Sequence, residues 1–258
     1  MTGAPESGKK SAHDEWFTDE SFWRELYPFM FPDTAFTVAE EQVDRALALT
    51  GAQAGAVLDL CCGPGRHAIP LAKRGFTVTG VDRTPFLLEK ARTRAATERV
   101  SVEFLLEDMR RFRRPESFDL AVNMFTSFGY FEDKAEDLEV LRHVYESLKA
   151  GGVFLLDMVS KEWLAKVFQA TTSTKLPAGQ LLVQRHEIVD DWTGVRNEWT
   201  VLDGERISTF AFRHRIYSGQ EIKDLLVHAG FLKPKLYGAL DGRPYGIDVS
   251  RLTVVSRK

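Results

Sequence analysis

The sequence predicts an α/β fold built on a doubly wound, mostly parallel seven-stranded sheet, with an inserted antiparallel β excursion after the fifth strand. Short apolar runs alternate with helical patterns between residues 56 and 157, and this alternation is typical of right-handed β-α-β crossovers. From about residue 161 the helical patterns between the strands disappear, which indicates antiparallel pairing. The chain has 258 residues, enough to bury one large core without a disulfide or a metal.

Each element of the parallel part has a local signal. Residues 37–40 read Thr-Val-Ala-Glu, a capping-box pattern that predicts a helix ending at Gly51. The apolar run 56–60 predicts a buried strand, and the glycine turn at 63–65 leads from it into a helix. The same reasoning predicts that helix over 66–74, strands at 76–81, 102–106, 118–122 and 153–157, and further helices at 84–97 and 134–149.

The excursion and the end of the chain are predicted from turns and caps. Ser218 and Glu221 form a second capping-box pattern, which predicts a helix as far as His228. Turns rich in Asp and Gly separate the strands of the excursion. The predicted strands are 181–189, 196–201 and 206–217 in the excursion, then 234–237 and 251–256 at the end of the chain.

The N-terminal region has two parts of contrasting composition. Residues 1–15 are small, polar and charged, and are expected to form a disordered tail. Residues 16–36 are far richer in aromatic side chains than the chain average of 11%. So many rings must cover either the edge of the domain or, as a lid, a bound ligand. We therefore expect one domain over 16–258, with a lid segment at 16–36 and the antiparallel insertion at 160–217.

The composition excludes several classes of protein. The chain is 44% hydrophobic and 28% charged with a net charge of −3, which exerts no net attraction on nucleic acid or an anionic membrane. It has neither an apolar run of roughly 20 residues nor a hydrophobic signal core, so we expect a cytoplasmic protein with no membrane partner. Cys61 and Cys62 are adjacent, without a second Cys/His pair at zinc spacing. No metal site is therefore expected.

Polar residues end four of the predicted parallel strands. Asp59, Asp82, Asp108 and Asn123 stand at or just after these ends. Because open α/β sheets bind ligands at the carboxyl ends of their strands, we expect these four side chains to surround a nucleotide-like ligand. Taken singly, each of them could merely cap the next turn.

The glycine turn leaves two kinds of ligand open. Residues 63–68 satisfy the pattern G-x-G-x-x-A, which is also the fingerprint of NAD(P)-binding proteins. In that fingerprint the glycines follow the strand almost directly, because the backbone approaches a pyrophosphate. Here Asp59 precedes them, and its carboxylate would repel a pyrophosphate but attract a cationic amino acid group.

A family resemblance goes further than these patterns. Residues 57–65, Val-Leu-Asp-Leu-Cys-Cys-Gly-Pro-Gly, resemble motif I of class I S-adenosylmethionine (SAM) methyltransferases. Glu107-Asp108-Met109, Asn123-Met124-Phe125 and Gly151-Gly152-Val153-Phe154 are similar to later motifs of that family and follow in the same order. The resemblance implies a Rossmann-like fold with SAM as the cofactor.

The resemblance also implies roles for individual residues. In that family the acid at the position of Asp82 binds the ribose hydroxyls, and the acid at the position of Asp108 accepts the adenine amino group. The N-terminal segment often carries an aromatic lid, for which Trp16, Phe17, Trp23 and Tyr27 are candidates. The residues expected to bind SAM are Tyr27, Asp59, Cys61, Gly63, Gly65, Asp82, Arg83, Asp108, Met109, Asn123 and Met124.

The methyl acceptor is expected to be a small molecule. Residues 124–130 and the excursion are similar to a subgroup of small-molecule N-methyltransferases that includes deoxyaminosugar N,N-dimethyltransferases. The resemblance implies transfer to nitrogen or oxygen, for which Tyr130 and His214 are the candidate catalytic residues. His214 alternates with apolar residues, so a hydrogen-bonded position on a half-buried face is the alternative. The excursion would roof the acceptor site or form a homodimer contact.

Two further functions are consistent with the same cofactor. One is methylation of RNA or protein, for which the basic run 110–114 would be the contact surface. That run is short and stands in a chain of net negative charge, which argues against nucleic acid as a partner. The other is a SAM-binding protein without catalytic activity.

Overall fold

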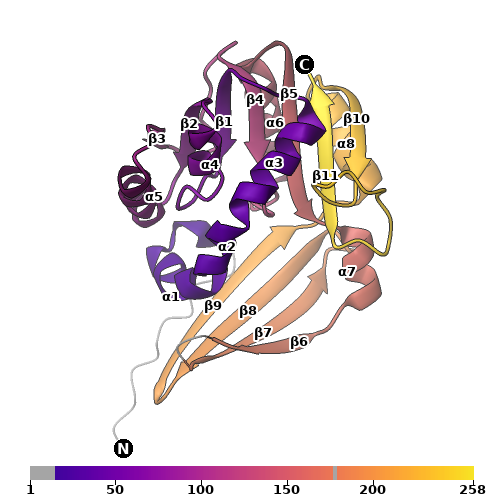
Figure 1. Cartoon of the computed structure of the whole chain (residues 1–258). Helices are drawn as coiled ribbons and strands as arrows, with labels where there is room; N and C mark the ends of the chain where they lie inside the picture. Colours follow the sequence, from indigo (N-terminus) through magenta and orange to yellow (C-terminus); the bar gives the residue numbers. More distant parts are fainter. Residues whose placement is uncertain (1–14, 177–178) are drawn as a thin grey trace, which may run out of the picture.

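The computed structural model describes residues 15–176 and 179–258. The predicted tail, residues 1–15, lies outside these ranges except for Glu15. Figure 1 shows a larger sheet with helices on both faces and a smaller sheet on the side where the parallel strands end. None of the helices in the described ranges is long and apolar enough to cross a bilayer.

The larger sheet has seven strands in the order β10-β11-β5-β4-β1-β2-β3. Neighbouring strands are parallel except that β11 runs antiparallel to both β5 and β10. The predicted doubly wound, mostly parallel sheet is therefore confirmed. The chain direction along the sheet reverses between β1 and β4, which is where such sheets form a ligand crevice. The strands are β1 Ala56–Leu60, β2 Thr77–Asp82, β3 Glu103–Leu106, β4 Phe118–Asn123, β5 Leu148–Val159, β10 Leu232–Tyr237 and β11 Arg251–Arg257.

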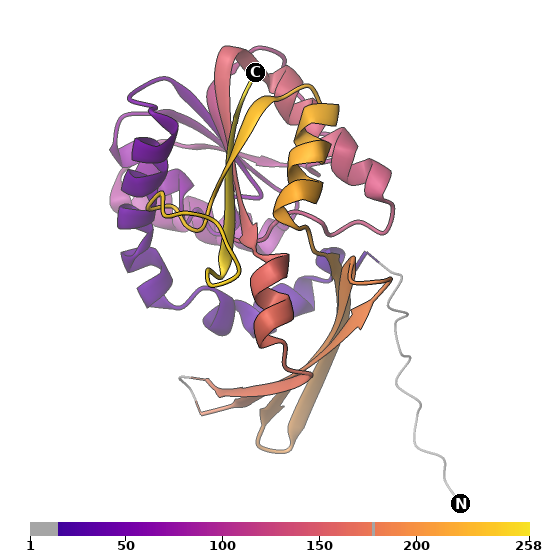
Figure 2. The ribbon, with the colours of Figure 1, turned by 90° about the vertical axis from the view of Figure 1, so that its right-hand side faces the viewer.

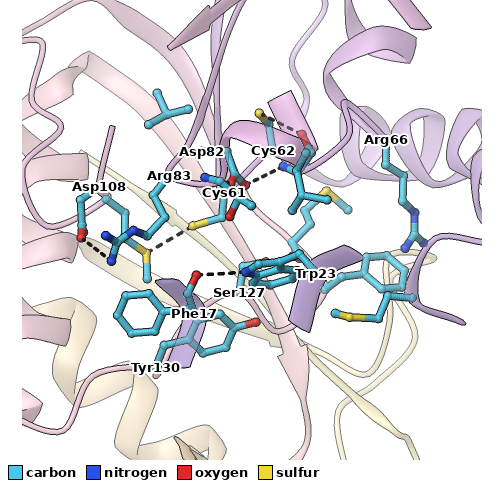
Figure 3. Close-up of a pocket in the computed structure, with 18 of the residues that line it drawn as sticks. Phe17, Trp23, Cys61, Cys62, Arg66, Asp82, Arg83, Asp108, Ser127 and Tyr130 are labelled. Atoms are coloured by element: carbon cyan, nitrogen blue, oxygen red, sulfur yellow. Dashed lines mark hydrogen bonds and ion pairs between the residues drawn. The ribbon is translucent and has the colours of Figure 1, made fainter. Parts of the chain in front are cut away.

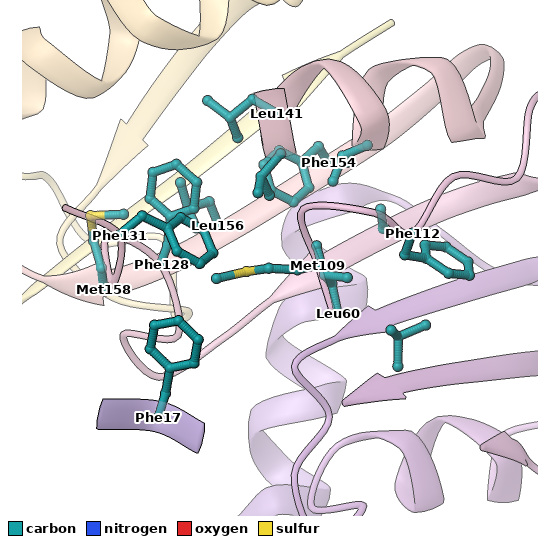
Figure 4. Close-up of a cluster of buried hydrophobic side chains, with 14 of the residues drawn as sticks. Phe17, Leu60, Met109, Phe112, Phe128, Phe131, Leu141, Phe154, Leu156 and Met158 are labelled. Carbon is teal, nitrogen blue, oxygen red and sulfur yellow. The ribbon is translucent and has the colours of Figure 1, made fainter. Parts of the chain in front are cut away.

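Helices cover both faces of this sheet because its strands bury side chains on both sides. Val57 and Leu58 are adjacent in β1 and both fully buried, yet they belong to two different apolar clusters. The cluster of Val57 joins the sheet to α3 and α4, and the cluster of Leu58, part of which Figure 4 shows, joins it to α6 and α8. Strands buried on both faces appear in sequence as continuous apolar runs, which made them predictable. The helices are α1 Glu20–Met30, α2 Asp33–Thr37, α3 Ala39–Thr50, α4 Ala68–Lys73, α5 Pro85–Glu98, α6 Lys134–Ser147, α7 Lys161–Val167 and α8 Gly219–His228.

Of the two capping-box predictions, one is wrong and one is confirmed. At residues 37–40, Thr37 ends α2 and its hydroxyl donates back to the Asp33 carbonyl, while Val38, in a helical conformation, precedes α3 without a side-chain cap. At the start of α8, the Ser218 hydroxyl accepts from the Glu221 amide, and the Glu221 carboxylate accepts from the Ser218 amide. A capping box needs an extended N-cap residue, and only Ser218 is extended.

The smaller sheet is antiparallel, with the strand order β6-β7-β8-β9 (Figure 2). It follows β5 and α7, as the change of pattern near residue 161 predicts. Neither β6 nor α7 was predicted, because β6 reads Thr-Thr-Ser-Thr-Lys with mostly exposed side chains, and α7 has only seven residues, none of them buried. The strands are β6 Thr171–Lys175, β7 Leu181–Val189, β8 Gly194–Asp203 and β9 Arg206–Arg215.

The aromatic N-terminal segment lies between the two sheets. A short 3₁₀ turn at Trp16–Thr18 precedes α1, and the indole nitrogen of Trp16 donates to the Arg213 carbonyl of β9 at 3.0 Å. The ring of Phe22 contacts that of Phe212 on the same strand, with centroids 5.4 Å apart. The sequence left two roles open for this segment, covering the domain edge or covering a ligand. In the structure it packs against the smaller sheet and fills the space between the two sheets.

A buried polar contact fastens the end of β9 to α6. The hydroxyl of Tyr217 donates to Oδ2 of Asp137 at 2.7 Å, and neither side chain is exposed beyond 2%. Arg215 lies beside the same carboxylate, with its Nε 3.3 Å from Oδ2. Burial raises the pKa of Asp137 to about 6, although Tyr217 and Arg215 both lower it. The buried Asp137 carboxylate therefore depends on Tyr217 and Arg215 to offset its loss of hydration.

We expect Tyr217→Phe to lower the free energy of unfolding by about 1–3 kcal/mol, because it removes a donor from a buried carboxylate. Urea unfolding followed by circular dichroism measures the change. Tyr237→Phe, on β10 and outside this contact, is the control and should change the free energy by less than about 0.5 kcal/mol. Equal effects of the two substitutions would contradict a specific role for the Tyr217 hydroxyl.

Candidate functional site

A cavity of about 230 Å³ lies at the carboxyl ends of β1, β2 and β4, where the direction of the sheet reverses (Figure 3). The N-terminal segment covers it with Phe17, Trp23 and Phe31. Its lining also includes Cys61, Cys62, Gly63, Arg66, His67, Asp82, Arg83, Thr84, Glu107, Asp108, Met109, Met124, Phe125, Ser127, Tyr130 and Phe131. A covered cavity at this point of an open α/β sheet is the expected site for a nucleotide-like ligand.

The glycine loop after β1 forms one wall of the cavity. Its backbone is left-handed at Cys61, Gly63 and Gly65, with φ of 61°, 52° and 78°. At Gly65 a Cβ atom would stand 3.0 Å from the Ile69 side chain, so glycine also suits the close packing of the loop on α4. Cys61 adopts the same conformation without being glycine, and its Sγ lies 3.4 Å from Sδ of Met109. The loop thereby brings its backbone and the Cys61 side chain to the cavity.

Asp82, at the end of β2, holds two segments of the site together. Its Oδ2 accepts from the Gly63 amide at 2.8 Å and its Oδ1 accepts from the Thr84 amide at 2.8 Å. Burial raises the pKa of Asp82, although these hydrogen bonds act to lower it. The carboxylate is therefore an anchor for the glycine loop as well as part of the cavity wall.

Asp59 and Asn123 lie behind the cavity wall, and each has a buried side-chain oxygen without a hydrogen-bond partner among the described residues. Asp59 is 2% exposed, and burial and the nearby Asp82 charge raise its pKa to about 7. Its Oδ2 has no hydrogen-bond partner among the described residues, and neither has Oδ1 of Asn123. The side-chain nitrogen of Asn123 donates to the Leu60 carbonyl at 3.2 Å. Buried oxygens without partners are uncommon and are often completed by a ligand.

The end of the cavity near β3 is anionic but already paired. Asp108 accepts from Nη2 of Arg110 at 2.7 Å, and Nη1 of Arg83 lies 3.6 Å away. Burial raises the pKa of Asp108, but the hydrogen bonds and charges of these two arginines outweigh it, so the pKa is lowered overall. Phe17 lies beside Arg83, whose guanidinium carbon is 5.1 Å from the ring centroid. This end combines a carboxylate with flat apolar surfaces.

The opposite end of the cavity is cationic. The guanidinium carbon of Arg66 lies 3.6 Å from the centroid of the Phe125 ring, and the His67 ring stacks on the same phenyl group at 5.5 Å. Oε1 of Gln42 accepts from Arg66 at 2.9 Å and lies 3.2 Å from Nε2 of His67. Burial, together with Arg66 and Arg251, lowers the pKa of His67 to about 3, so the imidazole is neutral and Arg66 carries the charge.

A second cavity, of about 490 Å³, lies between the first cavity and the smaller sheet. Phe17, Tyr130 and Phe131 line both cavities, so the two cavities are adjacent. Arg213 and Arg215 of β9 reach into the second cavity together with Glu15 and other charged side chains. The two adjacent cavities together offer room for two ligands.

The predicted cofactor residues fall into three groups. Those that line the first cavity are Cys61, Gly63, Asp82, Arg83, Asp108, Met109 and Met124. Asp59, Gly65 and Asn123 do not line it and stand behind the loop or at the strand ends. Tyr27 does not line it either, because its ring packs on Phe31 and Phe86.

The two candidate catalytic residues are far from equivalent. Tyr130 lines both cavities, and burial raises its pKa. His214 lines neither, and its Nδ1 is 3.2 Å from the side-chain nitrogen of Asn197, which in turn pairs with His186. Burial lowers the pKa of His214 to about 4.

Several lining residues were not among the predicted site residues. Trp23 and Phe17 were predicted only as members of a lid. Arg66 follows the glycine turn directly, and that position was a signal that could have identified it. Phe125 has a left-handed backbone, with φ of 61°, which no sequence pattern indicates. Met30 and Phe31 come from the N-terminal segment, which covers the cavity only through tertiary packing.

Comparison with known proteins agrees with this geometry. Residues 57–152 match the family model of a methyltransferase domain. A protein of Geobacillus sp. (strain WCH70), named provisionally as a methyltransferase, is 32% identical over 155 residues, or 59% of this chain and 62% of that protein. The dTDP-3-amino-3,4,6-trideoxy-alpha-D-glucopyranose N,N-dimethyltransferase of Streptomyces venezuelae is 26% identical over 74% of this chain and 81% of that enzyme.

One solved structure extends the similarity to almost the whole chain. SAM-bound CalS10, an amino pentose methyltransferase from Micromonospora echinaspora, matches with a TM-score of 0.67 at 23% identity, over 92% of this chain and 96% of that one. The Geobacillus alignment, by contrast, spans less than two thirds of that relative. The matched domain, the strand order and the cavity at the switch point agree with one another. Residues 57–152 are therefore a methyltransferase domain, and the fold of the chain is that of S-adenosylmethionine-dependent methyltransferases of known structure.

Proposed function

We propose that this protein binds SAM in the first cavity and transfers its methyl group to a nitrogen or oxygen of a small molecule held in the second. The observation that carries the proposal is the pair of adjacent cavities that share the lining residues Phe17, Tyr130 and Phe131. The N-terminal segment and the smaller sheet cover this space. A covered space suits a small acceptor better than a macromolecular one.

The residues of the first cavity fit the cofactor. SAM carries a cationic amino acid and sulfonium end, two ribose hydroxyls and an adenine ring, and it supplies an electrophilic methyl group. Asp82 would bind the hydroxyls, and Asp59, whose Oδ2 lacks a partner among the described residues, would attract the cationic end. Met109 and Phe17 offer apolar contacts for the ring near Asp108. Asp108 would have to share its carboxylate with Arg110.

The chain's main contribution to methyl transfer would be positioning. In the transfer, the acceptor nitrogen or oxygen forms a bond to the methyl carbon while the carbon–sulfur bond breaks and its electron pair stays on sulfur. Such a displacement requires in-line placement more than covalent help. The acceptor must also lose a proton, before transfer if it is an ammonium or a hydroxyl.

Tyr130 would assist as a hydrogen-bonding group rather than as a base. Because its pKa is raised by burial, the phenol keeps its proton at neutral pH and can orient the acceptor atom. His214 is neutral at that pH, but the side-chain nitrogen of Asn197 donates to its Nδ1. Its remaining nitrogen then carries the hydrogen, so His214 is the weaker candidate for a base.

We expect Tyr130→Phe to lower kcat by about tenfold while leaving the Kd for SAM within about twofold, as for the loss of one hydrogen bond at the reacting atoms. His214→Gln, which lies outside both cavities, is the matched comparison and should change kcat by less than about twofold. Initial rates of methyl transfer and calorimetric titration with SAM measure the two quantities. A larger effect of His214→Gln would reverse the assignment of the two residues.

Nitrogen is the favoured acceptor atom. Two of the similar proteins are named as methyltransferases of an aminosugar and an amino pentose, and their similarity supports an amine on a sugar-like small molecule. The basic run 110–114 gives little support to RNA, because three of its four arginines pair with acids: Arg110 with Glu136, Arg113 with Glu146 and Arg114 with Glu103. A paired surface retains little attraction for phosphate.

The direct test is transfer of radiolabelled methyl from SAM into a host-cell extract, which is then fractionated by size. Label in the small-metabolite fraction is the expected result, and mass spectrometry of that fraction identifies the product. Label in RNA or protein would overturn the small-molecule acceptor. SAM binding without label in any fraction of an acceptor-rich extract would favour a non-catalytic SAM-binding protein.

A further inference from the structure

Arg66 is a buried cation without a counter-ion. Its side chain is 9% exposed, and no other arginine or lysine in the described ranges is classed as buried. Its Nε has no hydrogen-bond partner there, and no carboxylate of the described residues lies within ion-pair distance of it. Its polar contact is one neutral acceptor, Oε1 of Gln42 at 2.9 Å. A guanidinium in this state pays for desolvation without the attraction that normally offsets it.

The neighbouring charges do not supply the missing counter-ion. Arg251 approaches the same Phe125 ring from 5.0 Å, but it forms an ion pair with Asp157, whose Oδ1 also accepts from Thr253 at 2.9 Å. That carboxylate is therefore already neutralised by Arg251. Burial is the main cause that lowers the pKa of Arg66 to about 10, which still leaves it charged at neutral pH.

The backbone under Arg66 is strained in a way that supports the contact. Phe125 and its neighbour Thr126 are both left-handed, with φ of 61° and 65°. The Phe125 amide donates to Oδ2 of Asp157 at 3.3 Å, and the Thr126 amide donates to the Asp157 carbonyl at 3.0 Å. Two consecutive non-glycine residues in this region cost free energy, and such strain is concentrated at ligand-binding positions. Here it holds the ring flat against the guanidinium.

The cavity is therefore polarised along its length. Figure 3 shows Arg66 at one end and Asp108 with Arg83 at the other, with Asp82 between them. Since Asp108 is paired with arginines, the free positive charge of the lining lies at the Arg66 end.

We propose that Arg66 is an anion-binding residue of this cavity and takes a carboxylate group of a bound ligand. A carboxylate matches the planar guanidinium, can reach Nε as well as a terminal nitrogen, and would supply the missing counter-ion. The group could come from the amino acid end of SAM or from an acidic methyl acceptor. The inference rests on the proposed function, because it assigns a ligand group to the same cavity.

The test separates the two sources with a pair of cofactor probes. Full-length wild type and Arg66→Met are titrated calorimetrically with SAM and with decarboxylated SAM, which lacks only the carboxylate. If the group belongs to SAM, Arg66→Met weakens SAM at least tenfold and changes decarboxylated SAM by less than twofold. If it belongs to the acceptor, both cofactors bind the variant as they bind wild type. In that case the labelled small product of wild type is retained by an anion exchanger at pH 8, and its formation rate at limiting extract falls at least tenfold in the variant.

Two further variants keep the test decisive. Arg94→Met removes an arginine that stacks on Phe36 at the same 3.6 Å distance but does not line the cavity, so it reports the cost of losing a stacked arginine outside the cavity. Arg66→Lys should recover part of the lost binding, because lysine restores the positive charge but not the paired donors of the planar guanidinium. Equal weakening of both cofactors, or no change in cofactor binding and in product formation, would overturn the proposal. Failure of wild type to bind SAM would instead contradict the proposed function.

Discussion

Replacing Asp82 by alanine is expected to weaken SAM binding by more than about 1.5 kcal/mol, or more than about tenfold. Two losses combine in this variant. The ribose hydroxyls lose their carboxylate partner, and the amides of Gly63 and Thr84, which both donate to Asp82, are left without an acceptor. The glycine loop is then no longer fastened to the end of β2. The effect should therefore exceed that of losing one hydrogen bond.

Calorimetric titration of the variant with SAM measures the loss. Asp119→Ala is a matched control, because Asp119 also accepts from a backbone amide, that of Ala56, but at the opposite end of the sheet. It should leave SAM affinity unchanged while lowering stability slightly. Unchanged affinity in Asp82→Ala would remove the ribose assignment.

Replacing Asp59 by asparagine should have opposite effects on stability and on cofactor binding. Burial and the Asp82 charge raise the pKa of Asp59 to about 7, well above that of an aspartate in an unfolded chain. The folded protein therefore binds this proton more tightly than the unfolded one. The resulting stabilisation is complete below about pH 4 and is lost as the pH rises towards and through 7. At pH 8 the ionised carboxylate destabilises the free protein by a few kcal/mol, on the order of 2–4.

Asp59→Asn should accordingly be more stable than wild type at pH 8, with the difference shrinking towards pH 5. Thermal unfolding of the free proteins between pH 5 and pH 8 measures this trend. Asp137, which also has a raised pKa, is present in both proteins and cancels in the comparison. SAM binding at pH 8 should become weaker in the variant by about tenfold or more, because a cationic group loses its carboxylate. If the difference in stability between the two proteins did not change with pH, ionisation of Asp59 would not destabilise the free protein.

Much of the larger sheet could be predicted because its central strands, β1, β2, β4 and β5, are buried on both faces. The same signals are weak in β6, an exposed polar edge strand, and in α7, a helix with no buried residue. Local pattern also failed at residues 37–40, where α2 occupies the place of the expected cap. An element whose conformation depends on tertiary contacts, and not on its own pattern of buried residues, cannot be recognised from local sequence periodicity.

The same distinction applies to the site. Asp82 and Asp108 could be placed because they end strands that the pattern locates. Arg66 and Phe125 are 59 residues apart in the numbering and meet only because two left-handed residues turn the second of them towards the first. Residue roles at the cavity remain predictions that the variants above would test.

The contact between Trp16 and Arg213 has a consequence for the order in which the protein is made. The two residues are separated by 197 positions, so at typical rates of translation the N-terminal rings are synthesised roughly 10–40 s before the strand that they pack against. During that interval Trp16 and Phe22 have no β9 to cover them. The roof of the cavity therefore closes late in synthesis, and the nascent chain exposes an aromatic segment to chaperones until the smaller sheet has emerged from the ribosome.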